Sequence, residues 1–216
     1  MTTTFTVEND FIFSGRNCGA CGKRTCEDFS NAVKEGVSNV HDCPFYIPVS
    51  NKVKDSSVES AVYSGVDVVG QKYDFWLAPI PGEISARKII LPFRPDLVEK
   101  WDIHKGDIVT GRPSGAGCPV QHVIKVLDAN PITGVITGFV VGPSYARNHD
   151  VKDVMEYHIL GFEGRAMVLS DTPQFGKRYS FLPGFCMMGR AHTGLVNTVI
   201  GKPWGLQVRI EGIVIV

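Results

Sequence analysis

The sequence lacks an excess of charge of either sign and lacks long apolar runs. Its 216 residues carry 22 Lys and Arg against 22 Asp and Glu, so the formal net charge is zero. Balanced charge argues against a protein that binds nucleic acid by neutralising phosphates. The longest apolar runs, such as 138–142 and 212–216, are much shorter than the roughly 20 residues of a membrane-spanning helix. The first residues carry no basic stretch before an apolar core, so we expect a soluble, cytoplasmic protein without membrane insertion.

Motifs of several common enzyme classes are also missing. The sequence has no G-x-G-x-x-G fingerprint after a predicted strand, no phosphate-binding P-loop and no G-x-S-x-G nucleophile elbow. Nicotinamide-dependent redox chemistry, ATP hydrolysis and serine-esterase chemistry therefore have no support. Whether the protein is an enzyme of another kind is left open by the sequence.

Six cysteines are present, and four of them lie close together in the N-terminal quarter. Three form a C-x2-C-x4-C pattern, and 16 residues separate the third from the fourth; these are Cys18, Cys21, Cys26 and Cys43. A disulfide framework is typical of small secreted chains, and a zinc site usually has two paired knuckles. Cys26 and Cys43 are too far apart in the sequence to form a second knuckle of this kind. The pattern favours an iron–sulfur cluster over these two alternatives, because such clusters are held by four thiolates.

The residues around these cysteines suit a tight ligand loop followed by a helix. Gly19 and Gly22 flank Cys21 and leave the backbone N–H groups open to approach. Thr25 is expected to cap a helix that begins at Cys26, and Gly36 is expected to end it.

The segment resembles a known family. Cys18-Gly-Ala-Cys21-Gly-Lys-Arg-Thr-Cys26, followed by Gly36 and by Asp42-Cys43-Pro44, is similar to the small four-cysteine [4Fe-4S] domain with the pattern CGxCG-x3-C-x16-CP. This domain occurs in the cluster-bearing subunit of the corrinoid/iron–sulfur methyltransferase system and in the iron–sulfur subunit of Rnf-type electron-transport complexes. The resemblance covers about residues 15–48 and implies one [4Fe-4S] cluster per chain, held by Cys18, Cys21, Cys26 and Cys43. It leaves the larger system open, because the module is found on unrelated partners.

The rest of the chain is rich in glycine and proline, with 23 and 13 in the whole sequence. Most lie after residue 64 between short apolar runs, which is typical of many short strands joined by turns. Two hairpins are predicted, one pairing 120–127 with 135–141 and one pairing 156–160 with 165–169. One helix is predicted at 95–101. A mainly antiparallel β-barrel or sandwich is therefore expected.

The chain as a whole is predicted to be α+β, with three parts. Residues 1–50 would form the small helix-containing [4Fe-4S] domain, 51–63 a polar linker and 64–216 the β-barrel-like domain. The closing run 212–216 is apolar on both faces. It is either a buried central strand or an edge strand covered by a second copy of the chain, so a homo-oligomer is one expectation.

A glycine-rich loop outside the cysteine motif is the second candidate site. Arg112, Ser114 and Cys118 lie in it just after a predicted strand, and they would bind a small molecule or cofactor. The alternative is a tight connection between two strands. Cys118 and His122 are four residues apart, roughly 13 Å along a strand, which is too far for direct proton transfer. Cys186 and His192 flank a Met-Met pair that would either line a ligand pocket or fill the core.

The favoured function is one-electron transfer in an anaerobic metabolism, with the β domain as a docking or shielding platform. Lys23 and Arg24, inside the ligand loop, would attract an acidic redox partner protein. The first alternative is a cluster-dependent enzyme or accessory factor whose β domain binds a small molecule near the cluster. The second is a redox or oxygen sensor.

Overall fold

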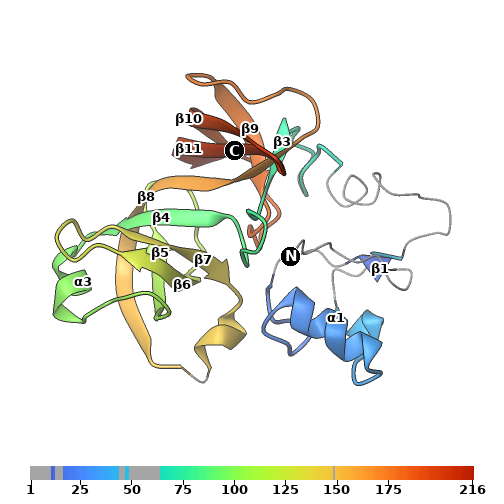
Figure 1. Cartoon of the computed structure of the whole chain (residues 1–216), viewed down its shortest axis with the longest axis horizontal. Helices are drawn as coiled ribbons and strands as arrows, with labels where there is room; N and C mark the ends of the chain where they lie inside the picture. The colour runs from blue at the N-terminus through green and yellow to red at the C-terminus, as the bar shows by residue number, and fades with distance from the viewer. Residues whose placement is uncertain (1–10, 13–16, 44–46, 49–63, 148) are drawn as a thin grey trace.

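The computed structural model describes residues 11–12, 17–43, 47–48, 64–147 and 149–216 (Figure 1). In chain order its elements are β1 (Phe11–Ile12), α1 (Cys26–Lys34), the 3-10 helix η1 (Val40–Asp42), β2 (Ile47–Pro48), β3 (Phe75–Ala78), β4 (Arg87–Pro92), α3 (Asp96–Lys100), β5 (Ile108–Pro113), β6 (His122–Ala129), β7 (Ile136–Val141), the 3-10 helix η2 (Pro143–Ala146), β8 (Val151–Val168), β9 (Arg178–Pro183), β10 (His192–Lys202) and β11 (Gly205–Ile215).

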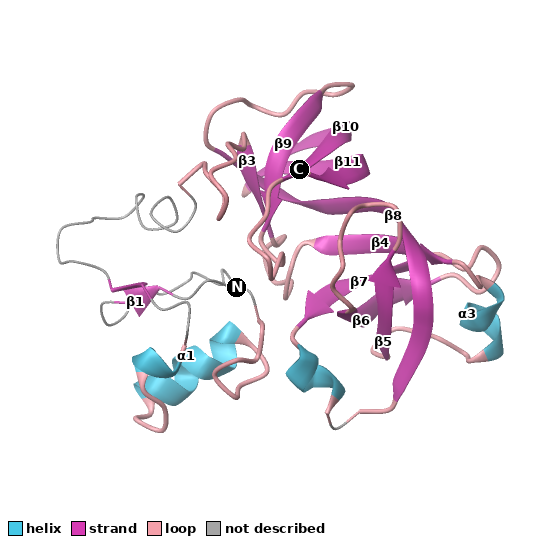
Figure 2. Cartoon of the chain, turned by 180° about the vertical axis from the view of Figure 1, so that it is seen from behind, coloured by secondary structure: helices cyan, strands magenta, loops and turns pink. Residues whose placement is uncertain are grey.

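One large sheet dominates the described structure. Its nine strands are ordered β11-β10-β9-β3-β8-β4-β7-β6-β5, and two further pairings, β11–β8 and β8–β5, close the sheet on both sides of β8. β8 is 18 residues long and runs through both halves of the sheet (Figure 2). Most pairings are antiparallel, but β3–β9 and β5–β8 are parallel, so the sheet is mixed.

The predicted α+β class is wrong, although the strands of the large sheet are mainly antiparallel, as expected for the second part. The described residues form a mixed nine-stranded sheet with two short α-helices, of nine and five residues. The sequence pattern identified the short apolar segments but not their partners. β8 accepts neighbours on both edges along its length, and two of the resulting pairings are parallel; the periodicity of a single segment contains no information on either point.

The predicted hairpin at 161–164 is also wrong, because β8 runs straight through this segment. A Cβ atom added at Gly161 would lie 2.7 Å from the Ile210 carbonyl oxygen, and one at Gly164 would lie 2.5 Å from the Ala78 carbonyl oxygen. These glycines therefore allow neighbouring backbones to approach closely and do not form a turn. The other predicted hairpin is confirmed: β6 pairs with β7, and the Asn130 side chain accepts hydrogen bonds from the turn.

Two main hydrophobic clusters lie on either side of β8, the strand that both halves of the sheet share. The first contains Phe75, Phe162 and Phe181, and the second contains Ile90 and Tyr157. Phe162 and Tyr157 both belong to β8, so this strand supplies side chains to both cores. Burial of each large side chain contributes roughly 1.5–3 kcal/mol.

Among the described residues, no helix is long and apolar enough to cross a membrane. The predicted linker at 51–63 lies outside the described residues. The division into 1–50, 51–63 and 64–216 therefore stays a prediction.

Candidate metal centre

Helix α1 places the third cysteine of the motif at its first position. The Thr25 hydroxyl accepts from the Asp28 backbone N–H at 2.8 Å, and the Asp28 carboxylate accepts from the Thr25 backbone N–H at 3.3 Å. This reciprocal pair is a capping box, which satisfies two backbone donors at the helix start. Gly36 follows the helix with φ +72°. The helix predicted from Thr25, Cys26 and Gly36 is confirmed.

The loop before the helix turns tightly around the first two cysteines. Gly19 and Gly22 have φ values of +75° and +79°, and the Gly22 N–H donates to the Gly19 carbonyl at 2.9 Å. A side chain at either position would be strained, so the loop needs glycine there. The fourth cysteine, Cys43, is the C-cap of η1 and is only 7% exposed.

Asn17 connects this loop to both the helix and the sheet. Its Oδ1 accepts from the Cys26 backbone N–H at 2.8 Å, and its Nδ2 donates to the Ile84 carbonyl at 3.1 Å. Asn17 is itself buried and has φ +48°, a left-handed conformation that asparagine tolerates better than most residues. One side chain therefore orients the first turn of α1 relative to the sheet.

The loop also packs on η2, which follows β7, and Figure 1 shows the blue N-terminal segment beside this short helix. A Cβ atom at Gly142 would lie 1.9 Å from the Asn17 carbonyl oxygen, so the two backbones are in direct contact. One at Gly19 would lie 2.7 Å from Ser144 Oγ. The Arg24 guanidinium lies 5.6 Å from the centre of the Tyr145 ring, a cation–π distance.

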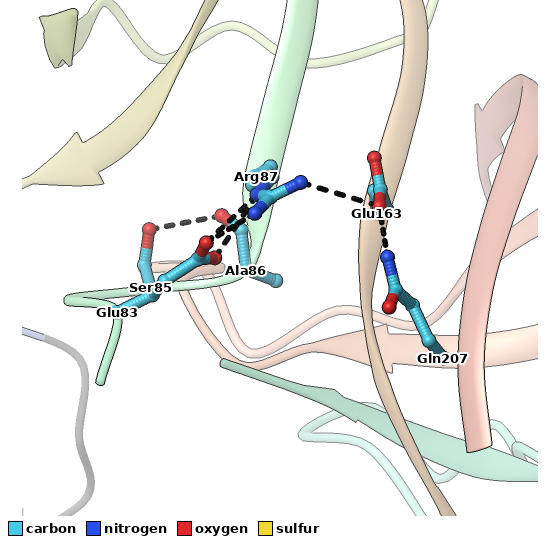
Figure 3. A network of polar contacts seen from close by, with 6 residues as sticks. All are labelled: Glu83, Ser85, Ala86, Arg87, Glu163 and Gln207. Carbon is cyan, nitrogen blue, oxygen red and sulfur yellow. Dashed lines mark hydrogen bonds and ion pairs between the residues drawn. The ribbon is translucent and has the colours of Figure 1, made fainter. Parts of the chain in front are cut away.

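A polar network stiffens the turn of the sheet that accepts the Asn17 side chain (Figure 3). Arg87 Nε donates to Glu83 Oε1 at 2.9 Å, and Arg87 Nη1 donates to Glu163 Oε1 at 3.3 Å. The Gln207 amide donates to the same Glu163 carboxylate. The turn is thereby tied to β8 and β11.

The four motif thiols share one electrostatic neighbourhood. Burial raises the pKa of the Cys26 thiol from 9.0 to about 11; a hydrogen bond from the Asn17 backbone opposes this, and the nearby Cys18, Cys43 and Cys21 raise the pKa further. No group of three or more His, Cys, Asp or Glu side chains in the described part of the chain is close enough to hold a single metal ion.

The residues present fit an iron–sulfur cluster. All four donors are thiols, the ligand type that holds such clusters. A Cβ atom at Gly22 would meet nothing within 4 Å, so space is open beside the loop. Ser144 Oγ is buried, lies next to Gly19 and makes no hydrogen bond with the described residues. Cys18, Cys21, Cys26 and Cys43 would hold the cluster, with the Ser144 hydroxyl as a free donor at the base of the loop.

The three residues predicted from the glycine-rich loop do not face one common point. Arg112 pairs with Glu156 on the surface. The Ser114 backbone N–H donates to the Tyr157 carbonyl at 2.9 Å, and Cys118 acts electrostatically on the buried Lys88. Their assignment to cofactor binding stays a prediction.

Lys88 and its neighbours form a second group that the sequence reasoning missed. Lys88 Nζ lies 3.1 Å from His122 Nδ1, which lies 2.9 Å from the Tyr157 hydroxyl. One signal was available: Lys88 is two residues before the apolar Ile90, so a strand places both on one buried face.

Comparison with known proteins agrees with the cysteine pattern. Residues 15–45 match the family described as "Putative Fe-S cluster". The match supports an iron–sulfur domain in this segment, and the chain continues into a nine-stranded mixed sheet. The chain is 34% identical over 213 residues to "Uncharacterized protein MJ0119" of Methanocaldococcus jannaschii, an alignment that covers 92% of this chain and 88% of the relative. The chain belongs to the same family as this protein. No solved structure matches it.

Proposed function

We propose that the protein is a one-electron carrier of an anaerobic metabolism, with one [4Fe-4S] cluster held by Cys18, Cys21, Cys26 and Cys43. When bound, the cluster supplies a single electron that it gains and loses without a proton or a bond to substrate. The protein supplies the four thiolates, orients them through α1 and η1, and shields one side of the loop with η2.

The observation that carries this proposal is the position of the ligand loop. Three of the four cysteines are partly exposed, while the fourth is buried against the fold. Electron transfer between proteins needs a redox centre close to the surface, and no substrate pocket is required. An open groove runs over the loop and α1, with Lys23, Arg24, Asp28 and Glu35 in its lining. This groove is the surface that a redox partner protein would cover.

Anaerobic purification tests the cluster directly. We expect about four irons and four sulfides per chain, as a cubane held by four thiolates requires. The reduced protein should give an EPR signal that appears and disappears in a one-electron titration. One zinc per chain with no sulfide would contradict the proposal.

The loop lysine gives a test of docking by charge. Lys23→Glu should slow reduction by anionic dithionite and speed reduction by the cationic methyl viologen radical, each on the order of twofold at low salt. Lys23 lies inside the ligand loop, between Cys21 and Cys26, so reversing its charge changes the local field at the site of electron entry. Stopped-flow absorbance measures both rates.

The matched control for this test is Lys105→Glu. Lys105 is exposed in the turn after α3, which lies on the opposite side of the sheet from α1 in Figure 1. If both substitutions change the two rates equally, the effect comes from net charge, and Lys23 has no special position.

An accessory factor whose β part binds a small molecule is the second candidate function, and one observation favours it. The β part of the protein contains the buried Lys88–His122–Tyr157 group, which electron transfer through the cluster does not use.

A further inference from the structure

Lys88 is a buried amine without an acidic partner. Its side chain lies on β4 between the two hydrophobic cores and is 1% exposed. Among the described residues no carboxylate lies within ion-pairing distance of its Nζ atom. Burying an unpaired ammonium group costs several kcal/mol. An amine in this position is therefore kept close to its neutral, nucleophilic form.

The nearest polar atoms are those of an imidazole and a phenol. Both the Lys88 amine, at 3.1 Å, and the Tyr157 hydroxyl, at 2.9 Å, contact the same His122 Nδ1 atom. One ring nitrogen either accepts with its single lone pair or donates its single proton. The three groups consequently share protons around one atom, which is the arrangement that a proton relay needs.

The other titratable groups near Lys88 come from three further segments. Cys118 lies in the loop before β6, Cys186 follows β9, and His192 begins β10. Burial lowers the pKa of Lys88 to about 7, although the two cysteines act in the opposite direction. Burial and the Lys88 charge together lower the pKa of His122 to about 2. Burial likewise lowers the pKa of His192 to about 4. At neutral pH both imidazoles are therefore uncharged.

The walls around the amine are aromatic. Lys88 Nζ lies 5.0 Å from the centre of the Tyr157 ring and 5.7 Å from that of Phe162. The Phe162 ring is 6.1 Å from the His192 ring. The imidazoles are neutral and the walls are aromatic, and the one further cation that acts on His192, Arg190, is paired with Asp67. The site therefore favours an uncharged compound over a carboxylate or phosphate.

The glycine-rich loop covers this group on the side of Cys118. Gly115 and Gly117 have φ values of +81° and +79° and are exposed, while Cys118 is partly exposed and close enough to act on Lys88. Because Lys88 is only 1% exposed, a compound from solution would have to displace this loop to reach the amine. The glycine-rich loop would then be the entrance to a site with Lys88 at its base.

We propose that Lys88 is the nucleophile of a covalent site for a small uncharged aldehyde or ketone. The Lys88 nitrogen bonds to the carbonyl carbon while the Tyr157 hydroxyl protonates the carbonyl oxygen, and a proton from the nitrogen passes by way of His122 Nδ1 to the Tyr157 oxygen without leaving the imidazole charged. The carbinolamine then loses its oxygen as water, together with the second nitrogen proton, and an imine remains. No oxidant or reductant is consumed. The site goes beyond the proposed function, because none of its steps uses the cluster.

Reductive trapping on the full-length protein tests the site. The protein is incubated with limiting acetaldehyde and cyanoborohydride at pH 7, and each lysine is followed by peptide mass spectrometry. An amine with a pKa of about 7 is half neutral at this pH, whereas about one in 2,500 ordinary lysines is neutral. We expect Lys88 to be ethylated at least tenfold faster than the exposed Lys105 and than Lys152, which is paired with Asp107. An unmodified Lys88 in a protein whose exposed lysines react would overturn the proposal.

Variants separate a reactive site from a structural lysine. Tyr157→Phe keeps the amine and should lower the Lys88 ethylation rate at least tenfold, because it removes the proton donor. Tyr73→Phe, at another buried tyrosine, is the matched control and should leave the rate unchanged. Equal rates in both variants would remove Tyr157 from the mechanism. Iron content, measured on the same samples, shows separately whether the cluster proposal holds.

Discussion

Replacing Cys26 by serine is expected to abolish the EPR signal of the reduced [4Fe-4S] cluster, with at least a tenfold loss of signal per chain. Cys26 begins α1, its backbone N–H is held by Asn17, and its thiol lies among the other three motif thiols. A cubane needs four thiolates, and serine is a poor replacement, so the cluster is lost or converted to another form. Iron and sulfide analysis alongside EPR distinguishes these two results.

Cys186→Ser is the matched control for this experiment. Cys186 is a buried free cysteine whose pKa, like that of Cys26, is raised by burial, but it follows β9 and is absent from the N-terminal motif. Its replacement should leave the visible absorption and the EPR signal intact. If both variants bleach equally, the four-cysteine ligand set is wrong.

Gly142→Ala is expected to weaken the attachment of the ligand loop to the sheet by about 1–3 kcal/mol, the usual cost of overpacking. Gly142 has φ −69°, so alanine suits the backbone conformation, and the effect is purely steric. The new methyl group would lie 1.9 Å from the Asn17 carbonyl oxygen, which belongs to the backbone and is fixed by the Asn17 contacts. The loop must therefore shift. Loss of cluster absorbance in air should become several-fold faster.

The control for Gly142→Ala is Gly201→Ala in β10. Gly201 is also outside the left-handed region, and a Cβ atom there would meet nothing within 4 Å. This variant should lose its cluster in air at the rate of the original protein. Equal cluster lifetimes in all three proteins would show that the packing of Gly142 on Asn17 does not protect the cluster.

Several local features were predictable because their causes are local. The capping residue Thr25 and the terminating Gly36 mark the ends of α1, since each acts on backbone groups within a few positions. The β6–β7 hairpin follows in the same way from the turn residues around Asn130. By contrast, the sequence alone does not distinguish Gly161 and Gly164 from glycines in a turn. Only their neighbours across the sheet show that they allow the backbones to approach closely.

The amino-acid sequence by itself indicated the four candidate cluster ligands, because the spacing of the cysteines and the glycines between them are properties of one short segment. It also indicated the strand-rich character of the rest. Only the tertiary structure decided how the strands pair around β8, that Asn17 and Gly142 hold the ligand loop against the sheet, and that Lys88 meets His122 and Tyr157. Those three residues are 34 and 35 positions apart, on β4, β6 and β8. Their meeting depends on register between strands, which is set by the packing of the whole sheet and by no single segment.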